Sequence, residues 1–279
     1  MSSLLRDKLL TRLAEMGAAP DHQRLASEVL GIRGAPPELA RRLVAQALVV
    51  EDRREAWRRV GERICRDAPN RPGVYVLQDA ADRALYVGKA VNLRRRLRAH
   101  FAERRWRRLP PELARAAGAE WSEVGSDLEA LLREAMLIEE LQPSVNVQTG
   151  APALDTRAIP KALVRDVVVL LPSIEDDSVE LVAAAVDGRT MLQRTRRSGD
   201  DLVVHAQRIM RFFCSPLARG RDSGVRAASA PIVFSWLAQC GERATRVDPH
   251  DVRSARELRA RLAALFRDDR LFHERLHQC

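Results

Sequence analysis

Apolar residues recur at helical spacing through the first 66 residues of the chain. Segments 4–16, 21–32 and 36–48 each place them three or four positions apart, and glycine and proline residues separate the segments. This pattern predicts three short helices. They fit either a plain helical bundle or a DNA-binding module of the helix-turn-helix or winged-helix type, and both interpretations stay open at this point.

The pattern changes after residue 66. Prolines interrupt the helical spacing between residues 66 and 73, and two short apolar runs, 73–78 and 83–87, then flank a polar segment. Two apolar runs around a short polar segment predict a β-hairpin.

Two long helices, a short helix after Pro110-Pro111 and one further strand are expected after the hairpin. Asn92 can cap a helix from Leu93 to about Arg105, and residues 119–125 have the composition of a third strand. A second helix is predicted from Asp127 to Leu141, with Pro143 ending it.

From residue 151 onward the chain has the pattern of a separate α/β region. Apolar runs predict strands within residues 164–173, 179–186 and 189–197, and helical spacing predicts helices within 200–213 and 254–269. The whole chain is therefore expected to be of the mixed α/β (α+β) class. Its predicted domains are an N-terminal helical domain at 1–66, a small central domain at 67–150 and a C-terminal α/β domain at 151–279.

The charge of the chain favours an acidic partner. The formal net charge is +9 among 279 residues, which is typical of nucleic-acid binding, although an arginine-rich composition from a GC-rich genome would give the same total. The local distribution is more specific, because residues 83–108 hold ten arginine or lysine residues and one acidic residue. Such a cluster is suited to phosphate groups.

Two classes of protein do not fit the sequence. A membrane protein is not expected, because the sequence contains no run of about 18 uncharged apolar residues. A secreted protein is not expected either, because charged side chains interrupt the first apolar segment, which a signal peptide would keep uncharged. We therefore expect a cytoplasmic protein with no membrane span.

The cysteines do not form a metal-binding pattern. They are scattered without a Cys-x-x-Cys pair, which argues against a zinc or iron–sulfur site: Cys65, Cys214, Cys240 and Cys279.

Candidate chemistry gathers in the predicted hairpin. Tyr75 and Tyr86, the only tyrosines of the chain, lie eleven residues apart in its two strands. Lys89 is one of three lysines among 47 basic residues. A lysine in an arginine-rich chain is expected where a compact charge must fit beside a phosphate oxygen, although its survival by chance is the alternative.

The helix after the hairpin has an apolar stripe and a basic side. Leu93, Leu97 and Phe101 form the stripe, and Arg96 and His100 are expected beside it, at the edge of the core. The other arginines of this basic run are expected to face outward and follow a nucleic-acid backbone, or to form a solvated face: Arg94, Arg95, Arg98, Arg104 and Arg105.

The helix 127–141 places one carboxylate among apolar residues. At about 100° per residue, Glu134 lies within the apolar sector, whereas Glu129, Arg133 and Glu140 are expected on the opposite, solvent side. A carboxylate among apolar residues is costly unless it is paired or binds a metal. Glu134 is therefore a candidate Mg²⁺ ligand, and a buried salt bridge to Arg96 is the alternative.

These residues together resemble a known family. Gly73-Val74-Tyr75, Tyr86-Val87-Gly88 and the lysine that follows, then the arginine-rich helix and the glutamate helix ending in Pro-x-x-Asn-Val, are similar to the GIY-YIG nucleases. Within that family, residues 70–148 resemble the nuclease module of the UvrC excinuclease and its shorter relative Cho.

The resemblance implies a role for each matched residue. His100 takes the position of a third tyrosine of UvrC, and Glu134 that of the metal-binding glutamate. The full set of catalytic residues implied in this way is Tyr75, Tyr86, Lys89, Arg96, His100, Glu134 and Asn146.

The resemblance also implies a fold and a function. The fold is a small domain with a central three-stranded antiparallel sheet flanked by helices. The activity is a DNA endonuclease that uses Mg²⁺ or Mn²⁺ to make single-strand incisions by phosphodiester hydrolysis, in nucleotide excision repair. The implied partners are DNA and repair proteins of the UvrA and UvrB type. Two alternatives remain, a catalytically silent DNA-binding module and a GIY-YIG nuclease of restriction or another DNA-processing pathway.

Overall fold

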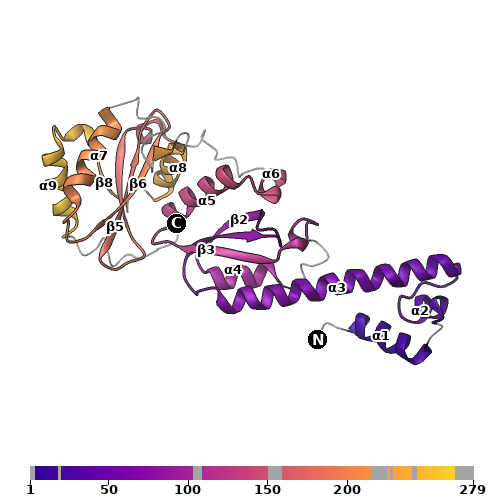
Figure 1. The fold of residues 1–279 in the computed structure, drawn as a ribbon. Helices are drawn as coiled ribbons and strands as arrows, with labels where there is room; N and C mark the ends of the chain where they lie inside the picture. The colour runs from indigo at the N-terminus through magenta and orange to yellow at the C-terminus, as the bar shows by residue number, and fades with distance from the viewer. Residues whose placement is uncertain are drawn as a thin grey trace. The chain divides into compact units, whose positions relative to one another are not determined.

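A computed structural model shows a chain of the mixed α/β class, as the sequence predicts. It contains one three-stranded sheet of order β2-β1-β3 and one five-stranded sheet of order β7-β6-β5-β4-β8, with helices around them (Figure 1). The structure describes residues 4–17, 20–102, 109–149, 159–214, 225–226, 229–240 and 244–267.

The chain divides into two compact units that cut across the predicted domains. Unit 1 comprises residues 1–68, 77–85 and 94–119. Unit 2 comprises residues 69–76, 86–93 and 120–279.

Unit 1 begins with three helices, α1 (Leu4–Met16), α2 (His22–Glu28) and α3 (Pro37–Asp67). Their apolar stripes meet in a small core around Leu9, Leu25 and Val44. Up to residue 72 the described residues contain no strand, so they offer no β-hairpin wing of the kind a winged-helix module has.

Helix α3 is longer than the short helix expected at 36–48. It runs for 31 residues, because the segment that follows contains no proline and supports the helix with ion pairs one turn apart. Arg58 pairs with Glu55 and Glu62 in this way, and Arg59 also pairs with Glu55. Gly61 allows Phe101 to pack directly against the backbone of α3, since a Cβ at position 61 would lie 2.6 Å from the Cβ of Phe101.

The predicted hairpin is present as β1 (Gly73–Gln78) and β2 (Ala84–Ala90). Its turn forms because the Asp79 carboxylate accepts hydrogen bonds from the backbone N–H groups of Ala81 and Arg83. These bonds and the Arg83 guanidinium lower the pKa of Asp79, with the Arg83 side chain as the largest cause.

The elements after the hairpin follow the predicted order. Helix α4 (Leu93–His100) comes next and ends before the predicted limit near Arg105. The 3₁₀ turn η2 (Leu113–Arg115) and strand β3 (Gly118–Glu123) follow. Helix α5 spans Asp127–Leu141, with the bounds that the sequence predicts, and short helix α6 spans Ser144–Thr149. The Ser126 hydroxyl caps α5 by accepting from Glu129 N, and Gln142 ends it with a left-handed φ of 46°.

The remainder of unit 2 is built on the five-stranded sheet. Its strands are β4 (Val167–Pro172), β5 (Ser178–Ala184), β6 (Thr190–Arg196), β7 (Val225–Arg226) and β8 (Thr245–Val247). Its helices are α7 (Leu202–Cys214), α8 (Ala230–Cys240) and α9 (Ala255–Leu265), with 3₁₀ turns η4 (Lys161–Leu163) and η5 (Pro249–Asp251). Helix α8 and strands β7 and β8 were not predicted from the sequence.

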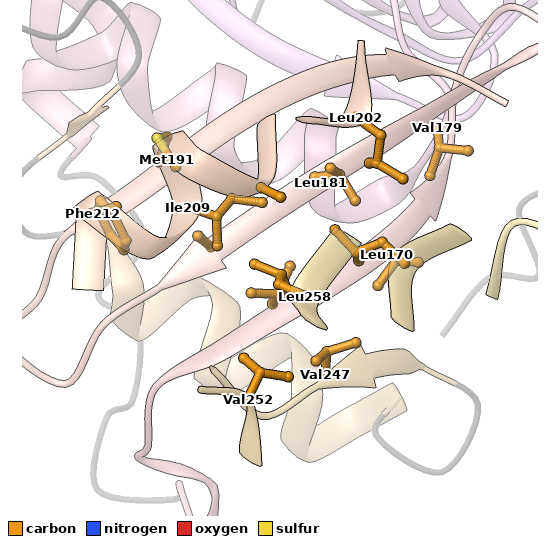
Figure 2. Close-up of a cluster of buried hydrophobic side chains, with 14 of the residues drawn as sticks. Leu170, Val179, Leu181, Met191, Leu202, Ile209, Phe212, Val247, Val252 and Leu258 are labelled. Carbon is orange, nitrogen blue, oxygen red and sulfur yellow. The ribbon is translucent and has the colours of Figure 1, made fainter. Parts of the chain in front are cut away.

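Alternate residues of the sheet face two separate cores. Leu170 and Leu181 lie on one face of the sheet, and the side chains on this face pack against α7 and α9 (Figure 2). Val169 and Val182 lie on the other face, and the side chains there pack against α8 and against Leu128 and Leu132 of α5. Both faces of the sheet are therefore covered, and α5 is one of the covering helices.

The position of Glu129 corrects the sequence prediction. Glu129 was expected on the solvent side of α5, but its exposed fraction is 0%. The helical pattern assumed one solvated face, whereas the five-stranded sheet covers the face that carries Leu128 and Leu132. Gly125 N and the Arg133 guanidinium hold the Glu129 carboxylate at 2.8 and 2.7 Å.

The start of α5 lies directly on the end of β4. A Cβ atom at Gly125 would lie 2.3 Å from the carbonyl carbon of Ser173 and 2.4 Å from the Pro172 oxygen. Backbone atoms cannot turn aside as a flexible side chain can, so only glycine fits at this contact.

We therefore expect Gly125→Ala to destabilise the protein by about 1–3 kcal/mol, the usual cost of forcing atoms into a packed core. Gly118→Ala is the matched control, because a Cβ there has no neighbour within 4 Å. Urea denaturation of both variants measures the difference. Equal stability of the two would contradict the close contact between α5 and β4.

Candidate active site

The outer edge of β2 is bonded to side chains instead of to another strand. In the sheet order β2-β1-β3, strand β2 lies at one edge. Asn146 Oδ1 accepts from Val87 N at 2.8 Å, and Asn146 Nδ2 donates to Val87 O at 3.0 Å. Glu134 Oε1 accepts from Lys89 N at 3.0 Å. Residues two apart present their backbone groups to the same edge, so α5 and α6 take the place of a fourth strand.

This arrangement fixes the Glu134 carboxylate. Glu134 is half-buried, and the bond from Lys89 N ties one of its oxygens to the strand. In the part of the chain that the structure describes, no group of three or more His, Cys, Asp and Glu side chains is arranged to hold a metal. One carboxylate suits Mg²⁺ or Mn²⁺, which keep several waters and accept substrate phosphates as ligands.

Asp127 is a site residue that the sequence analysis missed. Its carboxylate Oδ1 lies 2.8 Å from Lys89 Nζ. Asp127 and Glu134 are seven residues apart, which puts them within about 20° on one face of a helix. That spacing was the available signal. Lys89 thus contacts α5 twice, through its backbone with Glu134 and through its ammonium with Asp127.

The two tyrosines lie together over Gly88. Their ring centroids are 6.0 Å apart with planes tilted by 47°. A Cβ at Gly88 would lie 2.7 Å from the Tyr75 hydroxyl and 2.8 Å from the Tyr86 ring. Glycine after Tyr86-Val87 is therefore required so that both phenols can lie against the strand. Tyr75 is fully buried, whereas Tyr86 is half-buried.

Unit 1 contains the two predicted site residues of α4. Arg96 is exposed, in contrast with its expected place at the edge of the core, while His100 is buried as expected, with 8% exposed. His100 lines a small, mostly apolar hollow together with Trp57 and Phe101, whose ring centroids are 5.0 Å apart.

The predicted DNA-binding arginines divide into three groups. Arg94 does not face outward, because its guanidinium donates to Ala68 O at 2.6 Å and to Arg66 O at 3.3 Å. The last carbonyl groups of α3 lack helical partners, and Arg94 satisfies them. Arg95 and Arg98 are exposed as predicted. The remaining two predicted positions, Arg104 and Arg105, lie outside the described residues.

Comparison with known proteins identifies the central part of the chain. The family model for the UvrC-like GIY-YIG domain matches residues 71–147. UvrABC system protein C of Nitrobacter winogradskyi is 43% identical over 88 residues, which are 31% of this chain and 13% of that protein. The same-named protein of Paenarthrobacter aurescens is 44% identical over 84 residues, 29% of this chain and 12% of that protein.

A solved structure is also similar over this part. It is the N-terminal GIY-YIG endonuclease domain of UvrC from Thermotoga maritima, bound to magnesium. It is 30% identical, with a TM-score of 0.27, and the match covers 31% of this chain and 94% of that domain. The chain thus spans only a small part of the length of its full-length curated relatives. The family match and the identities with the curated relatives agree on one assignment: residues 71–147 form a UvrC-like GIY-YIG domain.

Proposed function

We propose that this protein is a DNA endonuclease that uses Mg²⁺ or Mn²⁺ to make single-strand incisions by phosphodiester hydrolysis. The observation that carries the proposal is the gathering of a carboxylate, an ammonium group and two phenols around residues 86–89 of β2. These groups can together hold a cation, neutralise a phosphate and exchange a proton with water.

Glu134 is the residue that would hold the divalent cation. Once bound, the cation supplies positive charge for the phosphoryl oxygens and makes the attacking water easier to deprotonate. Lys89 adds a second positive charge after its ammonium exchanges Asp127 for a phosphate oxygen. Arg96 is exposed on α4 and can bind a phosphate group.

The two phenols have different access to water, so we assign them different roles. Tyr86 is half-buried and can exchange a proton with the attacking water. Tyr75 is fully buried beside Gly88, where its ring supports that of Tyr86. Asn146 acts as a positioning residue, since its amide bonds both backbone groups of Val87. His100 remains a catalytic candidate through its position in the family pattern.

The name of the curated relatives supports a place in nucleotide excision repair. They are UvrABC system protein C, of which the matched part is 13% in the Nitrobacter protein. On this basis we infer DNA as the substrate, UvrA- and UvrB-type proteins as partners and the cytoplasm as the location. No helix of the described ranges is both long and apolar enough to cross a bilayer.

A plasmid-nicking assay with and without Mg²⁺ tests the proposed activity. Glu134→Gln keeps a side-chain oxygen for Lys89 N but removes the negative charge, so we expect cleavage to fall at least about 100-fold. DNA affinity in the absence of metal should not change. Glu140→Gln, on the exposed side of the same helix, is the matched control and should cleave normally.

A wild-type protein that binds DNA yet never nicks it in Mg²⁺ or Mn²⁺ would favour the catalytically silent binding module. Normal cleavage by Glu134→Gln would show that another residue holds the metal.

The tyrosine assignment predicts unequal effects of removing each hydroxyl. Tyr86→Phe should lower the single-turnover cleavage rate by about 100-fold or more, the usual contribution of a group that transfers a proton. Tyr75→Phe should lower it less, because that hydroxyl is shielded from water. Single-turnover rates at saturating DNA and Mg²⁺ decide between the two, and a larger loss in Tyr75→Phe would reverse the assignment.

The salt dependence of DNA binding tests the surface of α4. Replacing Arg95 and Arg98 by Glu should flatten the log–log salt slope by about 0.9 for each duplex phosphate that the protein no longer neutralises. Arg94→Gln is the control, since Arg94 bonds the end of α3; it should lower stability and leave the slope unchanged. Fluorescence anisotropy at several salt concentrations measures both. An unchanged slope in the variant with Arg95 and Arg98 replaced would place the DNA-binding surface elsewhere.

A further inference from the structure

The start of α5 is tied to the five-stranded sheet by a buried ionic cluster. Glu129 has no exposed surface, and its carboxylate Oε1 lies 3.6 Å from Arg194 Nη2, in addition to its contacts with Gly125 and Arg133. Arg194 belongs to β6, far from α5 in the sequence. Among these contacts of Glu129, the one with Arg194 reaches from α5 to the sheet.

Arg194 is itself fixed from the other side. It lies directly opposite Glu180 in the β5–β6 register, and its Nε donates to Glu180 Oε1. Glu180 is 1% exposed, and Ser173 Oγ donates to the same oxygen at 3.1 Å. The guanidinium thus lies between two buried carboxylates, one from the sheet and one from the helix.

The electrostatics of the cluster depend on Arg194. Burial, together with the nearby Glu180 carboxylate, raises the pKa of Glu129 above its usual range. Arg133 compensates Glu129 from within α5, whereas Arg194 is the cation that Glu129 shares with Glu180 of the sheet. The loss of Arg194 would therefore remove the attraction that draws Glu129 to the sheet and leave the repulsion from Glu180, which would push the start of α5 away from the sheet. The bidentate geometry of arginine suits this bridging position better than that of lysine.

We propose that Arg194 is a positioning residue for the active site: through Glu129 it holds α5 in the orientation that keeps Glu134 bonded to the Lys89 amide. Helix α5 carries both glutamates within two turns and moves as a rigid rod. A displacement of Glu129 therefore displaces Glu134. The part of this inference that concerns metal binding rests on the proposed function, whereas the part that concerns the Lys89 bond does not.

Backbone amide exchange in the whole chain, without metal or DNA, tests the positioning role directly. We expect the Lys89 amide to exchange at least about tenfold faster in Arg194→Ala than in the wild type, because it loses its Glu134 acceptor. The Val87 amide, which is bonded to Asn146, is the internal reference, and should change less. Arg194→Lys keeps the charge and should give an intermediate rate, and it provides the measurement if the alanine variant does not fold.

Arg189→Ala is the matched control for a general loss of stability. Arg189 is a buried arginine of the same region, pairs with Asp187 at 2.7 Å and donates to Phe212 O of α7 at 3.0 Å. Its loss should destabilise the sheet without a specific increase in the exchange rate of the Lys89 amide. Equal exchange at Lys89 in wild type and the Arg194 variants, or equal acceleration in Arg189→Ala, would overturn the proposal.

The Mg²⁺ dependence of nicking gives a second readout. Partners that orient a metal ligand typically change metal affinity by 10- to 100-fold, so the Mg²⁺ concentration for half-maximal cleavage should rise about tenfold in Arg194→Ala and stay unchanged in Arg189→Ala. A wild type that does not nick would overturn the proposed function alone, because the exchange measurement still decides the positioning role.

Discussion

The outer edge of strand β2 is the constraint on which the candidate active site depends. An edge strand presents backbone groups that no neighbouring strand satisfies. At Val87 and Lys89 these groups are bonded by Asn146 and Glu134. Leaving such a buried group unpaired costs about 1–3 kcal/mol, so the fold itself requires a polar side chain at each position. The same requirement places a carboxylate beside Lys89, which follows the glycine against which the two tyrosines lie.

Helix α5 connects this edge to the rest of unit 2. One side of it carries Asp127 and Glu134, which contact Lys89. Another side carries Leu128 and Leu132, which pack on the five-stranded sheet. The five-stranded sheet of the C-terminal region therefore supports the candidate site, because it packs against the helix that carries the proposed metal ligand. The close approach at Gly125 and the Arg194 cluster serve the same end.

The sequence predicted those features that local chemistry determines. The hairpin follows from apolar runs and a polar turn, and the bounds of α5 follow from Ser126, which caps it, and from Pro143. Gly88 and Lys89 were recognised because their neighbours form a known pattern. Tertiary contacts determined what was missed. Glu129 looks solvated on a helical wheel until a second sheet covers that face.

Two further errors have the same origin. Arg94 looks outward until the end of α3 accepts its hydrogen bonds. The length of α3 was underestimated because charged residues separate the apolar positions of its second half, where Trp57 and Ile64 are buried in the fold and Trp57 contacts Phe101. Ion pairs also support this part of the helix. Asp127 could have been predicted as a site residue, because its seven-residue spacing from Glu134 places both on the same face of a helix.

Paramagnetic broadening of backbone amide resonances by Mn²⁺ tests most directly whether the carboxylate at the edge of β2 holds a divalent cation. In the whole chain without DNA, the amides of Gly88 and Lys89 should broaden at the lowest Mn²⁺ concentrations, and Glu134→Gln should abolish this effect. Broadening that begins at the Asp201–His205 pair of the α7 region, with Lys89 still sharp, would contradict the assignment of the metal site.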